Sequence, residues 1–168
     1  VADALAASNR LGAGQFCTNP GIVVMLQSKE SDQFVEQFAI SQSNAAGESM
    51  LTETIYQQYT TSLQRLHNMQ ELKKIACGTA GQGTSTAVPH AFVVSGDLFL
   101  QQASLHEEVF GPCSIHVIAE NKEQLFDIAR ALTGQLTTTI WGTGEDWEVY
   151  ASLLTILQEK AGRLIING

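Results

Sequence analysis

Gly12-Ala13-Gly14-Gln15-Phe16-Cys17-Thr18-Asn19-Pro20-Gly21 is the stretch around which the chain is organised. It places a cysteine between two glycines and an Asn-Pro-Gly turn, directly before the apolar run 22–26. Glycines allow the backbone to approach a bound molecule closely, and Pro20 and Gly21 fix the turn into the following segment. The stretch therefore predicts a thiol on a loop at the start of a β-strand.

Two interpretations of Cys17 are open at this point. A free cysteine thiol has a pKa near ~8.5, so a nucleophilic role at neutral pH needs a neighbouring base or helix end. A backbone amide beside the thiol can hold the oxyanion that such a nucleophile generates. The alternative is structural, because most lone cysteines pack as small buried hydrophobes.

The composition is typical of a compact folded domain. The chain has 168 residues, of which 44% are hydrophobic and 15% charged, enough for one domain with a substantial core. Its net charge is −8, and its only adjacent basic pair is Lys73-Lys74. Because no basic patch can neutralise phosphates, we expect no nucleic-acid partner. No apolar run approaches the ~20 residues of a membrane span, so we expect no membrane partner either.

The three cysteines, Cys17, Cys77 and Cys113, are widely spaced and form no C-x-x-C pair. This spacing argues against a disulfide framework and against a zinc site, so we expect no metal and a reducing, cytoplasmic setting. Cys77 and Cys113 are expected to pack as small hydrophobes. The four histidines lie in no recognisable base motif: His67, His90, His106 and His116.

Helical and strand patterns alternate along the chain. Helical spacing of apolar residues predicts helices at 2–10, 32–44, 52–69, 121–132 and 144–160, with a shorter one at 97–102. Apolar and β-branched runs predict strands at 22–27, 90–95, 114–119, 136–141 and 164–166, the first covered on both faces. The glycines of 77–89 have the wrong spacing for a phosphate-binding fingerprint, so this segment is predicted to be a loop.

This alternation predicts an α/β fold of three layers, in which a mostly parallel sheet carries helices on both faces. In such folds ligands generally bind beyond the carboxyl ends of the strands or at helix termini.

Two segments closely resemble the signature segments of the aldehyde dehydrogenase superfamily. They are Gly12-x-Gly14-Gln15-x-Cys17 and, about ninety residues later, Glu107-Glu108-Val109-Phe110-Gly111-Pro112. The resemblance covers essentially the whole chain and implies that residues 1–168 are the catalytic, thiol-bearing domain of such an enzyme. The cysteine loop looks most like the branch that oxidises 2,5-dioxopentanoate (α-ketoglutarate semialdehyde) or long-chain fatty aldehydes, often with NADP.

The resemblance also implies roles for single residues. Cys17 would add to an aldehyde to give a thiohemiacetal, and loss of hydride to the nicotinamide would leave a thioester that water hydrolyses. Glu108 matches the glutamate that hydrogen-bonds the nicotinamide ribose, and Phe110 matches the aromatic residue beside the nicotinamide. Relatives line the aldehyde pocket with the two neighbours of the thiol, here Phe16 and Thr18.

Several parts that the resemblance implies lie outside the chain: the glycine-rich cofactor domain, the oxyanion-hole asparagine, the general-base glutamate and the oligomerisation elements. We therefore expect a catalytic-domain piece of an NAD- or NADP-dependent aldehyde dehydrogenase, homo-oligomeric at full length and inactive as this piece alone. Two alternatives remain open. An acylating relative would pass the thioester to coenzyme A, and a non-catalytic interaction domain would keep only the fold, with Glu107 and Glu108 in a solvated turn and Phe110 in the core.

Overall fold

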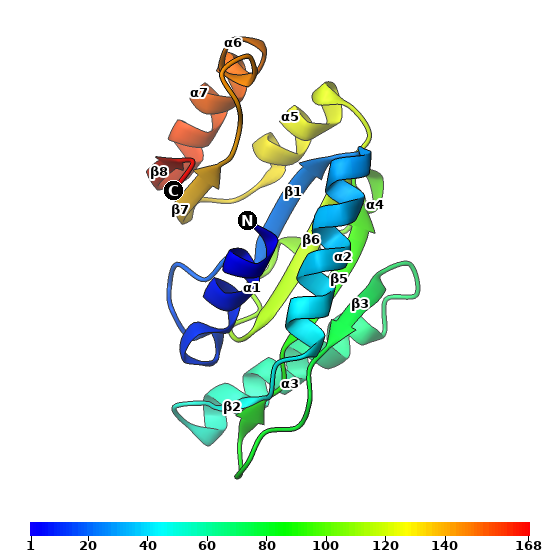
Figure 1. The fold of residues 1–168 in the computed structure, drawn as a ribbon, viewed down its shortest axis with the longest axis vertical. Coiled ribbons are helices and arrows are strands. Elements are labelled where there is room, and N and C mark those ends of the chain that lie inside the picture. The colour runs from blue at the N-terminus through cyan, green and yellow to red at the C-terminus, as the bar shows by residue number, and fades with distance from the viewer.

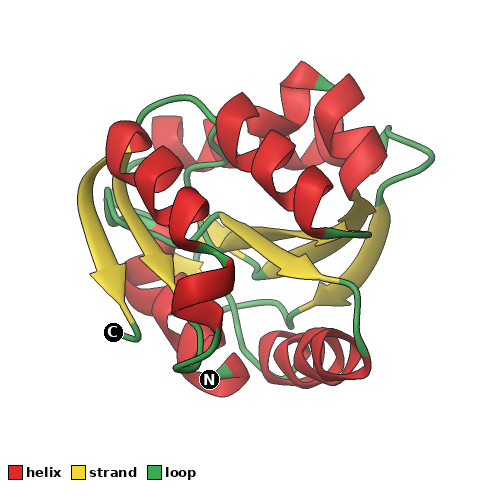
Figure 2. Ribbon diagram, turned by 90° about the horizontal axis from the view of Figure 1, so that it is seen from above, coloured by secondary structure: helices red, strands yellow, loops and turns green.

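The computed structural model describes residues 1–168, which form three layers (Figures 1 and 2). The central sheet has four strands in the order β1 (Ile22–Leu26), β6 (Cys113–Ala119), β5 (His90–Ser95) and β3 (Lys73–Cys77). β1, β6 and β5 run parallel, and β3 pairs antiparallel with β5 at the edge. The predicted α/β class and mostly parallel sheet are confirmed.

Helices cover both faces of this sheet (Figure 2). On one face lie α1 (Ala2–Arg10) and α2 (Lys29–Ser43), where Phe38 packs with Ala76 and Ala91. On the other face lie α3 (Glu53–His67), α4 (Gly96–Gln101) and α5 (Lys122–Ala131), which enclose the larger hydrophobic core with the sheet. Both faces of the central strands are therefore buried, as expected for a parallel sheet.

Side-chain caps determine where four of the helices begin. Ser28, Thr52, Ser95 and Asn121 each accept a hydrogen bond from the amide three residues later. Ser28 also forms a reciprocal capping box with Ser31, so α2 begins at Lys29 rather than at the predicted residue 32.

The remaining elements are shorter or lie outside the central sheet. Two 3-10 helices span Leu11–Gly14 and Ala103–His106. β2 (Glu48–Ser49) pairs antiparallel with β4 (Thr86–Ala87), and β7 (Gln135–Ile140) pairs parallel with β8 (Ala161–Ile166). β7 and β8 form a separate small sheet, together with α6 (Asp146–Val149) and α7 (Ala151–Lys160) beside it (Figure 1).

Several sequence predictions are corrected by these elements. The helix predicted at 144–160 is interrupted at Tyr150, which leaves helical geometry. The strand β3 was not predicted, because two lysines and a bulge between Lys74 and Ala76 hide its alternation. The segment 77–89 is not wholly a loop, since it contains β4 and the end of β3. β1 is only partly buried along its whole length, because it lies at the edge of the central sheet and not inside it.

One histidine lies inside the fold without a polar partner. His116 of β6 is completely buried against Phe38 of α2, with ring centroids 4.4 Å apart. Neither of its ring nitrogens has a hydrogen-bond partner. Burial lowers the pKa of His116 to about 4, because the imidazolium would lose its hydration without replacement. His116 is a core residue, and its neutral form is the one that the fold accommodates.

We expect replacement of His116 by leucine to remove part of the acid sensitivity of the fold. The pKa of His116 is lower in the folded chain than in the unfolded chain, so the unfolded chain binds more protons between these values and stability falls as the pH falls. Protonation of His116 in the unfolded chain therefore lowers the free energy of unfolding by about 2 kcal/mol when the pH falls from 7 to 5. Urea unfolding of wild type and His116→Leu at both pH values measures the difference, and the same pH dependence in both proteins would contradict this account.

Candidate functional site

The two loops that carry the signature residues lie against each other. Residues 15–21 lead into β1 and residues 107–112 lead into β6, and these strands are parallel neighbours with Ile22 opposite Ile115. The side-chain amide of Asn19 donates a hydrogen bond of 2.9 Å to the carbonyl oxygen of Gly111. The two loops therefore adjoin at the amino ends of β1 and β6 (Figure 1). Cys17 lies on the first loop and Glu108 on the second. This is the opposite end of the strands from that at which ligands of open α/β sheets generally bind.

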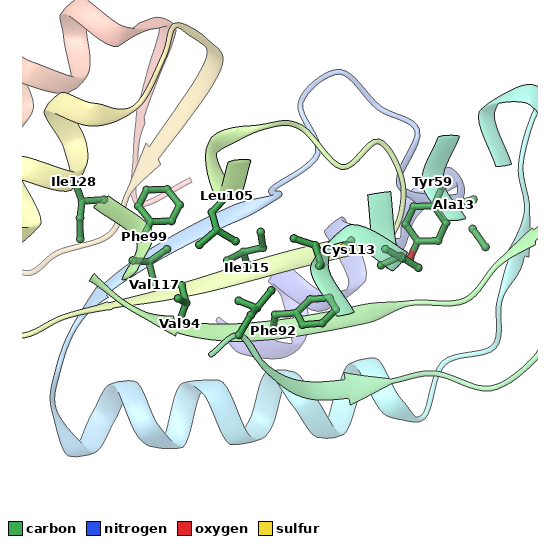
Figure 3. Packing of buried hydrophobic residues seen from close by; sticks show 14 of the residues in the cluster. Ala13, Tyr59, Phe92, Val94, Phe99, Leu105, Cys113, Ile115, Val117 and Ile128 are labelled. Carbon is green, nitrogen blue, oxygen red and sulfur yellow. The ribbon is translucent and has the colours of Figure 1, made fainter. Parts of the chain in front are cut away.

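Close backbone packing requires glycine in both loops. Gly14 has a φ of +67°, and a Cβ at this position would overlap the backbone of Gly111. Gly111 has a φ of +152°, and its Cβ would overlap the ring of Tyr59. Gly111 is therefore held between Gly14 and Tyr59, whose ring also lies beside Ala13 (Figure 3). The sequence predicted that the glycines would let the backbone approach a bound molecule; in the structure Gly14 instead approaches the second loop of the same chain.

A buried polar network supports the cysteine loop from the side of α1. Asn9 is fully buried, and its amide donates to the carbonyl oxygens of Cys113 at 3.0 Å and Pro20 at 3.3 Å. Gln42, also fully buried, donates to Asn9 at 2.8 Å and accepts from Arg10 at 3.0 Å. This network joins α1 and α2 to the first residues of β6 and to the turn before β1. Sequence reasoning missed it, because Asn and Gln on helices are mostly exposed.

Gln15 holds the glycine turn in place. Its side-chain amide donates to the carbonyl oxygen of Gly12 at 2.9 Å, and its side-chain oxygen accepts from the backbone amide of Leu51 at 2.8 Å. Gln15 is thus a positioning residue for the turn. Its side chain forms no hydrogen bond with Cys17.

The thiol and its two neighbours face solvent. Phe16, Cys17 and Thr18 are exposed, Phe16 by 53% of its surface. The backbone amides of all three residues make no backbone hydrogen bond. An oxyanion beside the sulfur could therefore receive a hydrogen bond from the Cys17 amide. No histidine forms a hydrogen bond with Cys17, in agreement with the absence of a base motif.

The adjacent carboxylates Glu107 and Glu108 have different surroundings. Glu107 forms an ion pair with Arg65 of α3, whereas Glu108 is exposed and makes no ion pair or side-chain hydrogen bond. The ion pair engages Glu107 and leaves the Glu108 carboxylate available to a ligand. Phe110 is half-buried and belongs to no hydrophobic core cluster. The sequence could not distinguish the two glutamates, because Arg65 is distant in the chain.

The structure separates the two remaining cysteines. Cys113 is buried at the start of β6, as predicted, and burial raises the pKa of its thiol to about 12. Cys77 is exposed at the end of the edge strand β3, so the prediction that it packs as a small hydrophobe is wrong. No group of three or more His, Cys, Asp or Glu side chains is arranged to hold a metal ion. None of the helices has both the length and the apolar character needed to cross a membrane.

Known proteins resemble this chain in sequence and in fold, although no family model matches it. It is 36% identical over 169 residues to an alpha-ketoglutaric semialdehyde dehydrogenase of Acinetobacter baylyi, and 33% identical over 168 residues to alpha-ketoglutaric semialdehyde dehydrogenase 2 of Azospirillum brasilense. Each alignment covers 100% of this chain and 32% of the relative.

Among solved structures, gamma-glutamyl-gamma-aminobutyraldehyde dehydrogenase of Burkholderia cenocepacia superposes with a TM-score of 0.79 at 16% identity, over 99% of this chain and 34% of its own. The fold of this chain therefore matches part of a solved aldehyde dehydrogenase structure. The chain belongs to the aldehyde dehydrogenase superfamily, and it spans about a third of the length of the curated relatives that it matches.

We expect Gly14→Ala to destabilise the protein strongly, because the new methyl group would collide with the backbone of Gly111 at a φ that favours glycine. A loss of about 3 kcal/mol corresponds to a fall in Tm of roughly 10 °C for a chain of this size. Gly21→Ala is the matched control, since no atom lies within 4 Å of its Cβ position and its φ is not positive. Calorimetry of both variants measures the effect, and similar Tm values would show that the loops do not depend on this contact.

Proposed function

We propose that the chain is the catalytic, thiol-bearing domain of an NAD- or NADP-dependent aldehyde dehydrogenase that oxidises 2,5-dioxopentanoate to the corresponding carboxylic acid. The observation that carries this proposal is the packing of the exposed Cys17 loop against the Glu108 loop, through Asn19 and Gly111. The names of the relatives support the substrate, and a fatty aldehyde is the alternative. In this proposal the full-length enzyme is a cytoplasmic homo-oligomer, and the 168-residue chain alone is inactive.

Cys17 provides the nucleophile. Its sulfur attacks the aldehyde carbon, a C–S bond forms, and the carbonyl oxygen becomes an oxyanion that the unpaired Cys17 amide can stabilise. Loss of hydride converts this thiohemiacetal to a thioester, and attack by water releases the carboxylic acid and regenerates the thiol. A bound nicotinamide dinucleotide contributes the acceptor for that hydride. Phe16 and Thr18, exposed on either side of the sulfur, line the space for the aldehyde.

Glu108 and Phe110 are the residues that we assign to cofactor binding. The Glu108 carboxylate is exposed and free of internal partners, so it can accept hydrogen bonds from both hydroxyls of a ribose. The neighbouring Glu107 pairs with Arg65, so Glu108 is the one of the two carboxylates that is free for a ligand. Phe110, half-buried two residues later, presents an aromatic ring on the same loop. Glu108 and Phe110 together are suited to bind the nicotinamide end of the dinucleotide.

Cys17→Ser in the full-length protein should reduce the formation of NADH or NADPH from 2,5-dioxopentanoate by at least about a thousandfold, because the serine hydroxyl is a far weaker nucleophile. Cys77→Ser is the matched control and should retain dehydrogenase activity, since Cys77 lies at the end of β3 and not on the loop before β1. Product analysis with and without coenzyme A distinguishes hydrolysis of the thioester from acyl transfer. Retention of activity in Cys17→Ser would contradict the role of this thiol.

Glu108→Gln should raise the KM for the nicotinamide cofactor about tenfold, because an amide gives weaker hydrogen bonds to ribose hydroxyls than a carboxylate does. Glu107→Gln provides the comparison, since it removes an adjacent carboxylate whose partner is Arg65 and should change this KM far less. Initial rates measured against NAD and against NADP also identify the preferred cofactor. Equal effects of the two substitutions would remove the reason for assigning Glu108 to the ribose.

A further inference from the structure

A second cysteine, Cys77, faces a histidine. It is the last residue of β3, the edge strand of the central sheet (Figure 1). In the antiparallel register with β5 it lies directly opposite His90. Residues opposite each other in such a pair project from the same face. The Cys77 Sγ atom lies 3.5 Å from Nε2 of His90 and 3.6 Å from the carbonyl oxygen of Gly78, and the residue is exposed. A reagent in solution can therefore reach a thiol that already contacts an imidazole.

The other ring nitrogen of His90 determines which tautomer is present. Nδ1 lies 2.8 Å from the carbonyl oxygen of Val88, which can only accept, so Nδ1 carries the proton in the neutral ring. The same carbonyl accepts a hydrogen bond of 2.7 Å from the Tyr59 hydroxyl, which holds it in place. The Nε2 lone pair of neutral His90 is consequently directed at the thiol.

His90 is neutral near pH 7. Burial lowers the pKa of His90, the hydrogen bond to Val88 opposes this effect, and the nearby charges of His67 and Lys74 lower the pKa further. The titratable groups around His90 come from three elements: Cys77 and Lys74 of β3, His67 and Tyr59 of α3, and Cys113 of β6. Burial keeps Tyr59 and Cys113 protonated, because it raises the pKa of both groups. His90 can thus act as a proton acceptor for Cys77.

We propose that Cys77 and His90 form a thiol–base pair that makes Cys77 a modification site for low-molecular-weight disulfides. Cys77 is the nucleophile, His90 is the base beside it, and the Val88 carbonyl oxygen orients the imidazole. Such an arrangement activates cysteine thiols. Lys74, close enough to affect the pKa of His90, provides a positive charge for a disulfide that carries carboxylates.

Cys113 does not compete for Cys77 by forming an internal disulfide. Cys113 and Cys77 each lie opposite His90, on the two strands that flank β5. Two strand spacings separate them by roughly 10 Å, beyond the ~7 Å between Cα atoms that a disulfide can span. The thiol of Cys77 therefore stays free of Cys113 and open to a partner from solution.

The modification is a thiol–disulfide exchange that needs only Cys77, His90 and the small disulfide. The thiol proton of Cys77 moves to Nε2 of His90 while the sulfur attacks one sulfur of the small disulfide. A new S–S bond forms to Cys77, the original S–S bond breaks, and the departing thiolate takes the proton from His90. Cys77 is oxidised to a mixed disulfide, and half of the small disulfide is reduced to a thiol. A second small thiol reverses the modification by the same route.

Glutathione disulfide is the probe for the test. The full-length protein is incubated with it at pH 7, and peptide mass spectrometry follows the modification of each cysteine separately. We expect Cys77 to be modified at least tenfold faster in wild type than in His90→Asn, in which the side-chain amide can still donate to Val88 but no nitrogen faces the thiol. His67→Asn is the matched control, because His67 packs against His90, with ring centroids 5.4 Å apart, and forms no hydrogen bond with Cys77. It should leave the rate within about twofold of wild type.

A measurement at high pH separates loss of the base from loss of structure. At pH 10 the thiolate forms without a base, so iodoacetamide should label Cys77 at equal rates in wild type and His90→Asn. Equal modification of wild type and His90→Asn by glutathione disulfide at pH 7 would overturn the proposal. It would also be overturned if His90→Asn reacted slowly both with glutathione disulfide at pH 7 and with iodoacetamide at pH 10. The readout is the modification of Cys77, so the result is independent of aldehyde turnover and of the role assigned to Cys17.

Discussion

The backbone contact between Gly14 and Gly111 is the constraint on which the arrangement of the candidate site depends. It brings two loops, far apart in the chain, to the amino ends of neighbouring parallel strands. Neither position tolerates a side chain, because Gly111 lies between Gly14 and the ring of Tyr59. The hydrogen bond from Asn19 to Gly111 then fixes the register between the loops. An exposed thiol and an unpaired carboxylate consequently lie on adjoining loops.

The residues that support the candidate site are different from the residues that are free to contact a ligand. The buried pair Asn9 and Gln42, the side chain of Gln15 and the ion pair of Glu107 with Arg65 all bind backbone or other protein groups. Cys17 and Glu108 make no such contacts. A rigid frame with free reactive groups is what binding and catalysis require, since little order must be created when the ligand arrives.

The sequence predicted the α/β class and most elements, with 2–10 and 90–95 placed at the observed bounds. These segments have clear periodicity and local start signals. The failures have distant causes: β3 is an edge strand with a bulge, and Asn9 reaches a carbonyl 104 residues away. The same limit applies to the site. The family resemblance proposed Cys17 and Glu108 as site residues. It could not predict the partner of Glu107 or the histidine beside Cys77, because those contacts exist only after the strands and helices have packed.

The central claim is that the Cys17 and Glu108 loops form one site for a nicotinamide cofactor and an aldehyde. A crystal structure of the full-length protein with bound NAD or NADP tests it most directly. The account predicts that the Glu108 carboxylate accepts hydrogen bonds from the nicotinamide ribose while the nicotinamide ring lies beside the Cys17 sulfur. A cofactor bound elsewhere, with Glu108 in solvent and Cys17 remote from the nicotinamide, would contradict it.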